Sequence, residues 1–238
     1  MPKLNELKLH RFTLLQTAQS GHGKTTRTLT ATRFGKLYIF DLDGKAQGAA
    51  RNLPPAMQIN GDLVEVDSFD SLDSALVKLK ELVAMGKDIP FATVCVDTFT
   101  ALNEMAYIKF MGSNLEKGIK ADYDIWGKID SFLLNFFNLL FSLPCNIIVN
   151  AHVAESEDEV TKRTKYAQAG RGGFRTKLPN RFTDSHYLVF QFDKYQVRVK
   201  NSDTLPVNTS IDPKLISKDG MATVNDLSIF DAYAIKKL

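Results

Sequence analysis

The sequence predicts an α/β fold in which helices cover a mostly parallel β-sheet, followed by a small antiparallel β extension. Three observations lead to this prediction. Short apolar runs alternate with helical segments along the first 150 residues, as in parallel sheets with helical crossovers. These runs are apolar on both faces, as expected for buried strands. From about residue 187, apolar and polar residues alternate instead, which is typical of antiparallel strands.

Five buried strands are predicted in the first 150 residues. Each is a short, mainly apolar run, and the run ATVCV ends directly before Asp97. The strands are expected at residues 12–17, 36–41, 63–66, 92–96 and 146–150.

Four helices are predicted between these strands. In residues 71–85, apolar side chains recur on one helical face, and Gly86 follows where a C-terminal cap belongs. Gly112 follows a second helical segment, and Pro144 ends the last one. The helices are expected at residues 25–32, 71–85, 98–111 and 124–143.

The change of pattern divides the chain into two parts that are expected to pack as a single domain. Residues 1–185 are predicted to form the α/β core, and residues 186–238 a β-hairpin extension with a C-terminal tail. The hairpin strands are expected at residues 187–192 and 195–200. The polar, glycine-containing stretch at residues 154–180 is predicted to be a long functional loop.

The composition indicates a soluble, cytoplasmic protein. Hydrophobic residues make up 44% and charged residues 24%, and no uninterrupted apolar run is long enough to cross a bilayer. The first residues lack the apolar core of a secretion signal. Cys95 and Cys145 lie in or beside apolar runs, so reduced buried thiols are expected rather than a disulfide or a metal site.

The charge is distributed unevenly along the chain. The net charge is only +3, but residues 160–200 contain ten Lys/Arg and two Asp/Glu. The rest of the chain carries 20 basic and 25 acidic residues. One basic segment on an otherwise acidic protein indicates a polyanionic partner.

Residues 18–26 read AQSGHGKTT and match most of the phosphate-binding loop pattern (P-loop) G-x-x-x-x-G-K-[ST]. An apolar run precedes the loop and a helical segment follows, as this loop requires. Lys24 is expected to reach the β- and γ-phosphates of ATP, and the Thr25 hydroxyl to bind Mg²⁺. The predicted nucleotide-binding residues are Ala18, Gln19, Ser20, Gly21, His22, Gly23, Lys24, Thr25 and Thr26.

Ala18 stands where the pattern has its first glycine. An alanine fits if its φ is negative, and costs about 1 kcal/mol if φ must be positive. The alternative interpretation of the whole stretch is a chance match in a surface turn.

Asp97 is the predicted second metal-binding residue. It ends a buried strand, and ligands of open α/β sheets bind at the carboxyl ends of strands. We expect it to hold Mg²⁺ through water. The alternative is that Asp97 only caps the helix that follows.

The catalytic base is not obvious, because Thr98 follows Asp97 where many ATPases have a glutamate. The run YIFDLDG supplies Asp43 as the predicted base, with Asp41 as the second choice. Asp43 would lie beside the γ-phosphate if its strand and the Asp97 strand flank the first strand. Aspartate is shorter than glutamate, so slow hydrolysis is expected.

These segments resemble the RecA-like P-loop ATPases, and more closely the short bacteriophage members such as the Sak-type single-strand annealing and recombination proteins. The matching segments are AQSGHGKTT, VCVDTFTAL, DYDIWGKID, IIVNAH and YQVRVK, spread over about residues 12–200. The resemblance implies a RecA-like core, ATP and Mg²⁺ as cofactors, and DNA-stimulated ATPase activity. It also implies a ring or filament of identical subunits in the cytoplasm of an infected bacterium. Single-stranded DNA and a single-strand-binding protein are the implied partners.

The resemblance further implies roles for residues near the ends of two strands. His152, or secondly Asn150, matches the position that senses the γ-phosphate; alternatively His152 is an ordinary loop residue. Arg198 and Lys200 match basic residues that reach the nucleotide of a neighbouring subunit; alternatively they form a solvated strand face. Lys24, Asp43, His152, Arg198 and Lys200 are therefore the predicted catalytic residues.

The basic segment TKRTKYAQAGRGGFRTKLPNRF interleaves cations with aromatic residues, a composition suited to single-stranded DNA. The alternative is that its arginines serve a subunit interface or pack on the core. Trp126 and Tyr123 are expected in the core rather than on bases. The predicted DNA-binding residues are Lys162, Arg163, Lys165, Tyr166, Arg171, Phe174, Arg175, Lys177 and Arg181.

The sequence thus predicts an ATPase that binds single-stranded DNA and promotes annealing or recombination. The 238 residues contain no counterpart of the extra domains of full-length recombinases, so strand exchange is not expected. Three alternatives stay open: a nucleotide-gated DNA-binding module with negligible turnover, a RecA-like helicase or helicase loader, and a small-molecule kinase.

Overall fold

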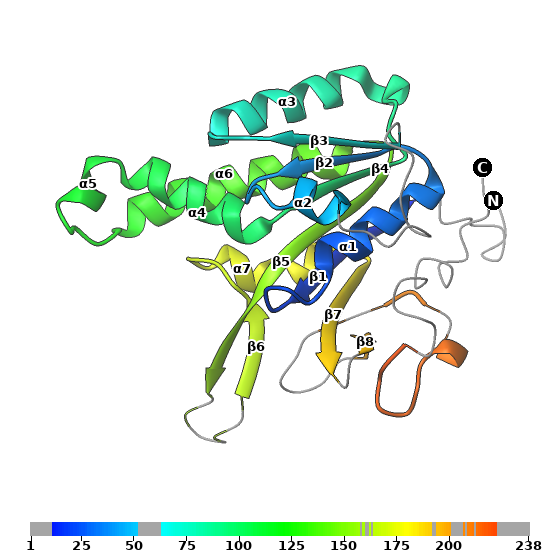
Figure 1. The fold of residues 1–238 in the computed structure, drawn as a ribbon. Coiled ribbons are helices and arrows are strands. Elements are labelled where there is room, and N and C mark those ends of the chain that lie inside the picture. The colour runs from blue at the N-terminus through cyan, green and yellow to red at the C-terminus, as the bar shows by residue number, and fades with distance from the viewer. Residues whose placement is uncertain are drawn as a thin grey trace, which may run out of the picture.

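The computed structural model describes residues 11–51, 63–157, 159, 162, 164–191, 194–200, 207, 209–211 and 213–222. These residues form an eight-stranded sheet with helices packed against both faces (Figure 1). The strands are β1 (Thr13–Ala18), β2 (Leu37–Asp41), β3 (Val64–Ser68), β4 (Thr93–Asp97), β5 (Asn146–Glu157), β6 (Thr164–Gln168), β7 (Asp184–Gln191) and β8 (Lys194–Arg198).

The helices of the described chain are mostly those that the sequence predicts. The α-helices are α1 (Lys24–Leu29), α2 (Ala46–Arg51), α3 (Leu72–Met85), α4 (Phe99–Met111), α5 (Ser113–Glu116), α6 (Tyr123–Ser142) and α7 (Phe174–Lys177). Short 3-10 helices lie at Thr30–Phe34, Gly86–Asp88, Pro179–Arg181 and Pro213–Leu215. The helix predicted at residues 25–32 is therefore shorter than expected and continues as a 3-10 helix.

The strand order is β3-β2-β4-β5-β1-β7-β8, with β6 paired to β5. Neighbours from β3 through β7 are parallel, whereas β5–β6 and β7–β8 are antiparallel. The fold class predicted from the sequence is confirmed. The register aligns Asp41, Asp97, Asn150 and Gln16 in one row across four strands, so their side chains meet at one edge of the sheet.

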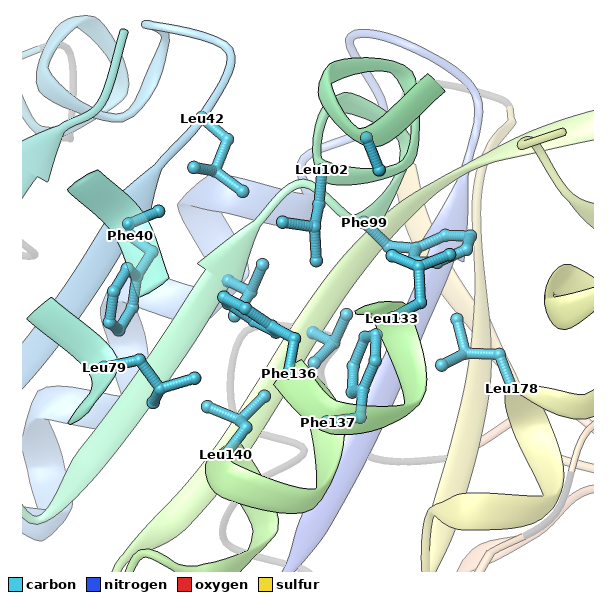
Figure 2. Packing of buried hydrophobic residues seen from close by; sticks show 14 of the residues in the cluster. Phe40, Leu42, Leu79, Phe99, Leu102, Leu133, Phe136, Phe137, Leu140 and Leu178 are labelled. Carbon is cyan, nitrogen blue, oxygen red and sulfur yellow. The ribbon is translucent and has the colours of Figure 1, made fainter. Parts of the chain in front are cut away.

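Two apolar layers hold the helices on the sheet. Alternate residues of β2, β4 and β5 point to one face, where they pack with α3, α4 and α6. Phe40, Leu102 and Phe136 belong to this layer (Figure 2). The intervening residues, among them Ile39 and Ile148, pack on the other face with Leu29 of α1. Strands that are apolar on both faces are thus explained by burial on both sides.

The prediction of a long loop at residues 154–180 is wrong. β5 continues beyond the sheet to Glu157 and pairs with β6 as an antiparallel hairpin, which extends away from the helical layers (Figure 1). The residues of this hairpin are mainly polar because both of its faces lie largely outside the core, so no apolar alternation marks it in the sequence.

The predicted hairpin near residue 190 is present as β7–β8. However, β7 also pairs in parallel with β1, from Leu14 opposite Asp184 to Thr17 opposite Tyr187. The boundary predicted between residues 185 and 186 therefore lies inside a strand of the main sheet. Most of the predicted C-terminal tail lies outside the described residues.

None of the helices in the described part of the chain has the length and apolar character needed to span a membrane.

Candidate functional site

The P-loop connects the end of β1 to the start of α1. Gly21 and Gly23 both have φ of 78°, the left-handed conformation that favours glycine. Ala18 is the last residue of β1, is fully buried, and is absent from the described non-glycine residues with positive φ. The alanine in place of the first glycine therefore fits this loop without backbone strain.

Lys24 lies beneath the loop, with its ammonium group directed at the loop backbone. Nζ donates to the carbonyl oxygens of Ala18 (3.1 Å) and Gln19 (3.0 Å). Burial lowers the pKa of Lys24 to about 8, while the negative charges of Asp97 and Asp43 oppose that shift. A buried ammonium group that donates to neutral carbonyl oxygens is suited to an anionic ligand.

Thr25 and Asp97 form the second part of the site. The Thr25 hydroxyl donates to Asp97 Oδ2 at 2.7 Å, and Asn150 Nδ2 donates to Asp97 Oδ1 at 3.1 Å. Burial raises the pKa of Asp97 to about 6. The cap of α4 is Thr98, whose side chain accepts from the Ala101 N–H, so Asp97 is not needed as a helix cap.

Asp43, in the turn after β2, and His152, on β5, also lie at the site around Lys24. Asp43 Oδ2 lies 4.0 Å from His152 Nε2 and 3.3 Å from Lys45 Nζ, whereas Asp43 Oδ1 is buried and has no hydrogen-bond partner among the described residues. His152 Nδ1 lies 3.2 Å from Lys24 Nζ. Burial lowers the pKa of His152, and the nearby charges of Lys24 and Lys45 add to the effect.

The route by which Asp43 reaches this site differs from the prediction. The condition on which that position depended, that its strand and the Asp97 strand flank β1, is not met, because β1 lies between β5 and β7. Asp43 instead reaches His152 from the turn after β2. Asp41, the second choice as base, accepts from the backbone N–H groups of Lys45 (3.1 Å) and Ala46 (3.1 Å). Its carboxylate is therefore engaged in holding the start of α2.

A buried amide network supports Asp97, and sequence reasoning missed its function. Gln16 Nε2 donates to Asn150 Oδ1 (2.8 Å) and to Thr28 Oγ1 (2.9 Å). Gln16 and Asn150 are fully buried. The signal was present in the sequence, since each is a polar residue inside an otherwise apolar strand and buried polar groups are normally paired.

The predicted DNA-binding residues that the structure describes lie on the β5–β6 hairpin, on α7 and on the segments beside α7. Lys162 and Lys165 lie on the β5–β6 hairpin, and Lys162 pairs with Glu157 (3.6 Å). Tyr166 also lies there, half-buried, with its ring 5.7 Å from that of Tyr187. Arg163 lies outside the described residues.

The segment after the hairpin is anchored on α4 and α6. Asn103 accepts from the Arg171 N–H (2.6 Å) and donates to the Arg171 carbonyl (3.2 Å). The Arg171 guanidinium pairs with Glu104 (2.8 Å) and lies 4.2 Å from the centre of the Tyr107 ring. Gly172 has φ of 76° and passes so close to Trp126 that a Cβ would lie 3.0 Å from the ring. This segment therefore packs as part of the fold.

Aromatic residues were assigned to the wrong environment at two positions. Phe174 is 4% exposed and stacks against Phe137, so the prediction that it contacts DNA bases is wrong. Tyr123, expected in the core, is 90% exposed. Trp126 does pack as expected, with its ring 5.6 Å from that of Tyr107.

The other predicted cations lie on two segments, α7 with the 3-10 helix after it and the end of β8 with the residues that follow. Arg175 donates to the Gly170 carbonyl (3.2 Å), and Arg181 donates to Asn138 Oδ1 (2.5 Å). Lys177 is exposed. Arg198 ends β8 and Lys200 follows it, so β7 separates both from the P-loop strand. A role of these two residues at a neighbouring subunit's nucleotide stays a prediction.

The comparison with protein families identifies the type of domain. A family model described as an AAA domain matches residues 11–207. Because this match spans well over half of the chain, the protein belongs to that family, whose members are P-loop nucleotide-binding ATPases. No curated protein matches the chain.

Proposed function

We propose that this protein binds ATP together with Mg²⁺ and hydrolyses the terminal phosphate, with Asp43 as the general base. The observation that carries the proposal is a continuous set of contacts at one edge of the sheet. Asp43 faces His152 at 4.0 Å, His152 contacts Lys24 at 3.2 Å, and Thr25 binds Asp97 at 2.7 Å.

The residues present fit a magnesium nucleotide. The Lys24 ammonium is buried against neutral carbonyls, and a phosphate would supply the counter-charge that it lacks. Thr25 and Asp97 offer the hard oxygen ligands that Mg²⁺ prefers. When bound, the magnesium nucleotide supplies the electrophilic phosphorus and neutralises charge on the phosphate oxygens.

Asp43 has the features of a base that can act on water. Its Oδ1 is buried and has no partner within the described part of the chain, so that a proton acceptor is available next to the phosphate cradle. Its Oδ2 is oriented by Lys45. His152 is neutral near pH 7 because its pKa is lowered. A neutral ring that accepts from Lys24 at Nδ1 carries its proton on Nε2, on the side of Asp43.

We further propose single-stranded DNA as the partner, bound by a homo-oligomer that promotes annealing or recombination. The support is the resemblance of the motifs and the connection between position 152 and the β5–β6 hairpin. His152 N–H donates to Thr100 Oγ1 (3.0 Å), and Thr100 Oγ1 donates to the carbonyl of Ala169 (3.1 Å), just after β6. A change at His152 is therefore transmitted to the segment that leaves the hairpin.

The test combines turnover with DNA binding. Phosphate release is measured with and without an oligonucleotide for the wild type and the Lys24→Ala variant. Lys36→Ala, which removes a cation paired with Glu65 on a distant strand, is the matched control. We expect Lys24→Ala to lower turnover at least a hundredfold and Lys36→Ala to leave it unchanged.

The proposal that the protein binds single-stranded DNA is tested by fluorescence anisotropy of labelled single- and double-stranded DNA. Each titration is run without nucleotide, with ADP and with a non-hydrolysable ATP analogue. Single-strand affinity that shifts with the analogue supports the proposal. Nucleotide-dependent affinity without turnover would instead favour a nucleotide-gated module. No DNA binding in any state would leave the ATPase and remove DNA as the partner.

A further inference from the structure

A second basic site lies at the other end of the sheet. A cavity of about 470 Å³ is lined by Arg11, Thr13, Phe141, Arg181 and Thr183. Thr13 begins β1, whereas the P-loop follows the last residue of the same strand. The two sites are thus separated by the length of β1, and the cavity is not part of the candidate nucleotide site.

Both arginines are held against the last turn of α6. Arg11 donates to the carbonyls of Leu143 and Phe141, the latter at 3.0 Å. Arg181 donates to Asn138 Oδ1 at 2.5 Å, and its guanidinium lies 5.6 Å from the centre of the Phe141 ring. Two cations from distant parts of the chain therefore meet at Phe141, Arg11 at its backbone carbonyl and Arg181 at its ring.

Neither arginine is paired with a carboxylate among the residues that the structure describes. Their acceptors are backbone carbonyls and one neutral amide. Asp184 is next to Thr183 in sequence, but its side chain is fully buried and accepts from Ser210 and Thr183. The carbonyls at the C-terminus of α6 partly offset the charge of Arg11, whereas Arg181 contacts the neutral amide of Asn138 and the Phe141 ring. Two half-buried cations close together favour an anionic ligand.

We propose that this cavity binds a phosphate group, carried either by a free phosphate ester or by one nucleotide unit of a single strand. Guanidinium groups present paired N–H donors that match phosphate oxygens. The cavity volume is within the range of small-ligand pockets. Phe141, Thr13 and Thr183 line the same cavity.

The experiment uses the full chain with Lys24→Ala, so that the P-loop contributes little to phosphate binding. Calorimetry measures the affinity for inorganic phosphate and thymidine monophosphate, and anisotropy measures the affinity for a labelled thymidine 15-mer. The variants Arg181→Gln and Arg11→Gln are compared with Lys117→Gln, which neutralises an exposed lysine next to α5.

We expect Arg181→Gln to weaken binding of the preferred probe about tenfold, since hydrogen bonds to charged groups are strong. Lys117→Gln should change nothing. Binding of the small probes identifies a free phosphate ester as the source, and binding of the 15-mer alone identifies a strand. Failure of all three probes, or equal affinity with and without both arginines, overturns the proposal.

Because Arg11→Gln also removes two hydrogen bonds to the end of α6, it could weaken the fold itself. Arg181→Lys is therefore included, since it keeps the charge but loses the paired donors. It should bind with intermediate affinity, and circular dichroism verifies that each variant is folded. Turnover is not a readout, so failure of the ATPase proposal leaves this test valid.

Discussion

Polar side chains are held differently in two regions of the molecule. One region is the edge of the sheet next to the P-loop, and the other is the basic segment at residues 162–181. At the sheet edge, polar groups bind one another: Asn150 contacts Asp97, Asp97 contacts Thr25, and Gln16 contacts Asn150. In the basic segment, the arginines that the structure describes bind separate partners. Arg171 pairs with Glu104 of α4, and Arg181 with Asn138 of α6.

This difference distinguishes a ligand site, at the edge of the sheet, from cations that anchor one part of the fold to another, in the basic segment. Groups that bind one another around a cradle stay together when a ligand arrives, and their charges act on the same point. Cations that each hold a separate contact help to stabilise the fold at that contact. The four predictions below test this distinction, from the largest expected effect to the smallest.

The largest effect is expected for Asp43→Asn. Loss of a general base lowers turnover by about 10²- to 10⁴-fold, while nucleotide affinity stays similar because the phosphate cradle is intact. Steady-state phosphate release and binding of a fluorescent ATP analogue measure the two quantities. The control is Asp41→Asn, which weakens the start of α2 by about 1 kcal/mol with a much smaller effect on turnover. Full turnover by the Asp43 variant would exclude this residue as the base.

A large loss of stability is expected for Phe174→Ala. This ring is 4% exposed and packs on Phe99 and Phe137, so its removal lowers the free energy of unfolding by about 3–5 kcal/mol. Urea denaturation measures the change. Tyr166→Ala, which removes a half-buried ring of the hairpin, should cost clearly less. If Phe174→Ala kept the stability and lost DNA affinity, the ring would belong to the binding surface after all.

The third prediction concerns pH and Asp97. Its pKa of about 6 lies above the ordinary value of 3.8 because of burial, so the folded protein retains a proton that the unfolded chain has lost. The free energy of unfolding therefore falls as pH rises from about 4 to about 6, by on the order of 3 kcal/mol, and this contribution is constant above that range.

Urea denaturation of the nucleotide-free protein between pH 4.5 and 7.5 measures this dependence. The Asp97→Asn variant, which cannot titrate at this position, should lack this part of the slope. Parallel curves for the two proteins would show that Asp97 titrates normally.

The smallest effect is expected for the DNA affinity of alanine variants at Lys162 and Arg171. Lys162 is exposed on the hairpin, and its replacement by alanine should reduce single-strand affinity a few-fold and the salt dependence by one phosphate contact, about 0.7 in the logarithmic slope. Arg171 is held by Glu104 and Tyr107, so Arg171→Ala should leave that slope unchanged. The opposite result would assign the anchored segment, and not the hairpin, to the DNA.

The sequence alone determined those features that depend on local backbone geometry. The P-loop needs glycines at positive φ and a helix after a strand, and these demands leave a recognisable spacing. The position of Asp97 follows in the same way, because the end of an apolar run marks the carboxyl edge of a parallel sheet. The covering of both sheet faces by helices follows from strands that are apolar on both faces.

Only the tertiary structure decided which residues of different strands contact one another and which partners the arginines of the basic segment bind. The order of strands puts β5 between β1 and β4, and this places Asn150 against Asp97 and His152 against Lys24 and Asp43. Nor does local sequence reveal that Asn103 and Glu104 of α4 bind Arg171, 67 or more residues away. Hydrogen bonds and ion pairs depend on distance in space, and for residues this far apart in the chain the packing of helices on the sheet sets that distance.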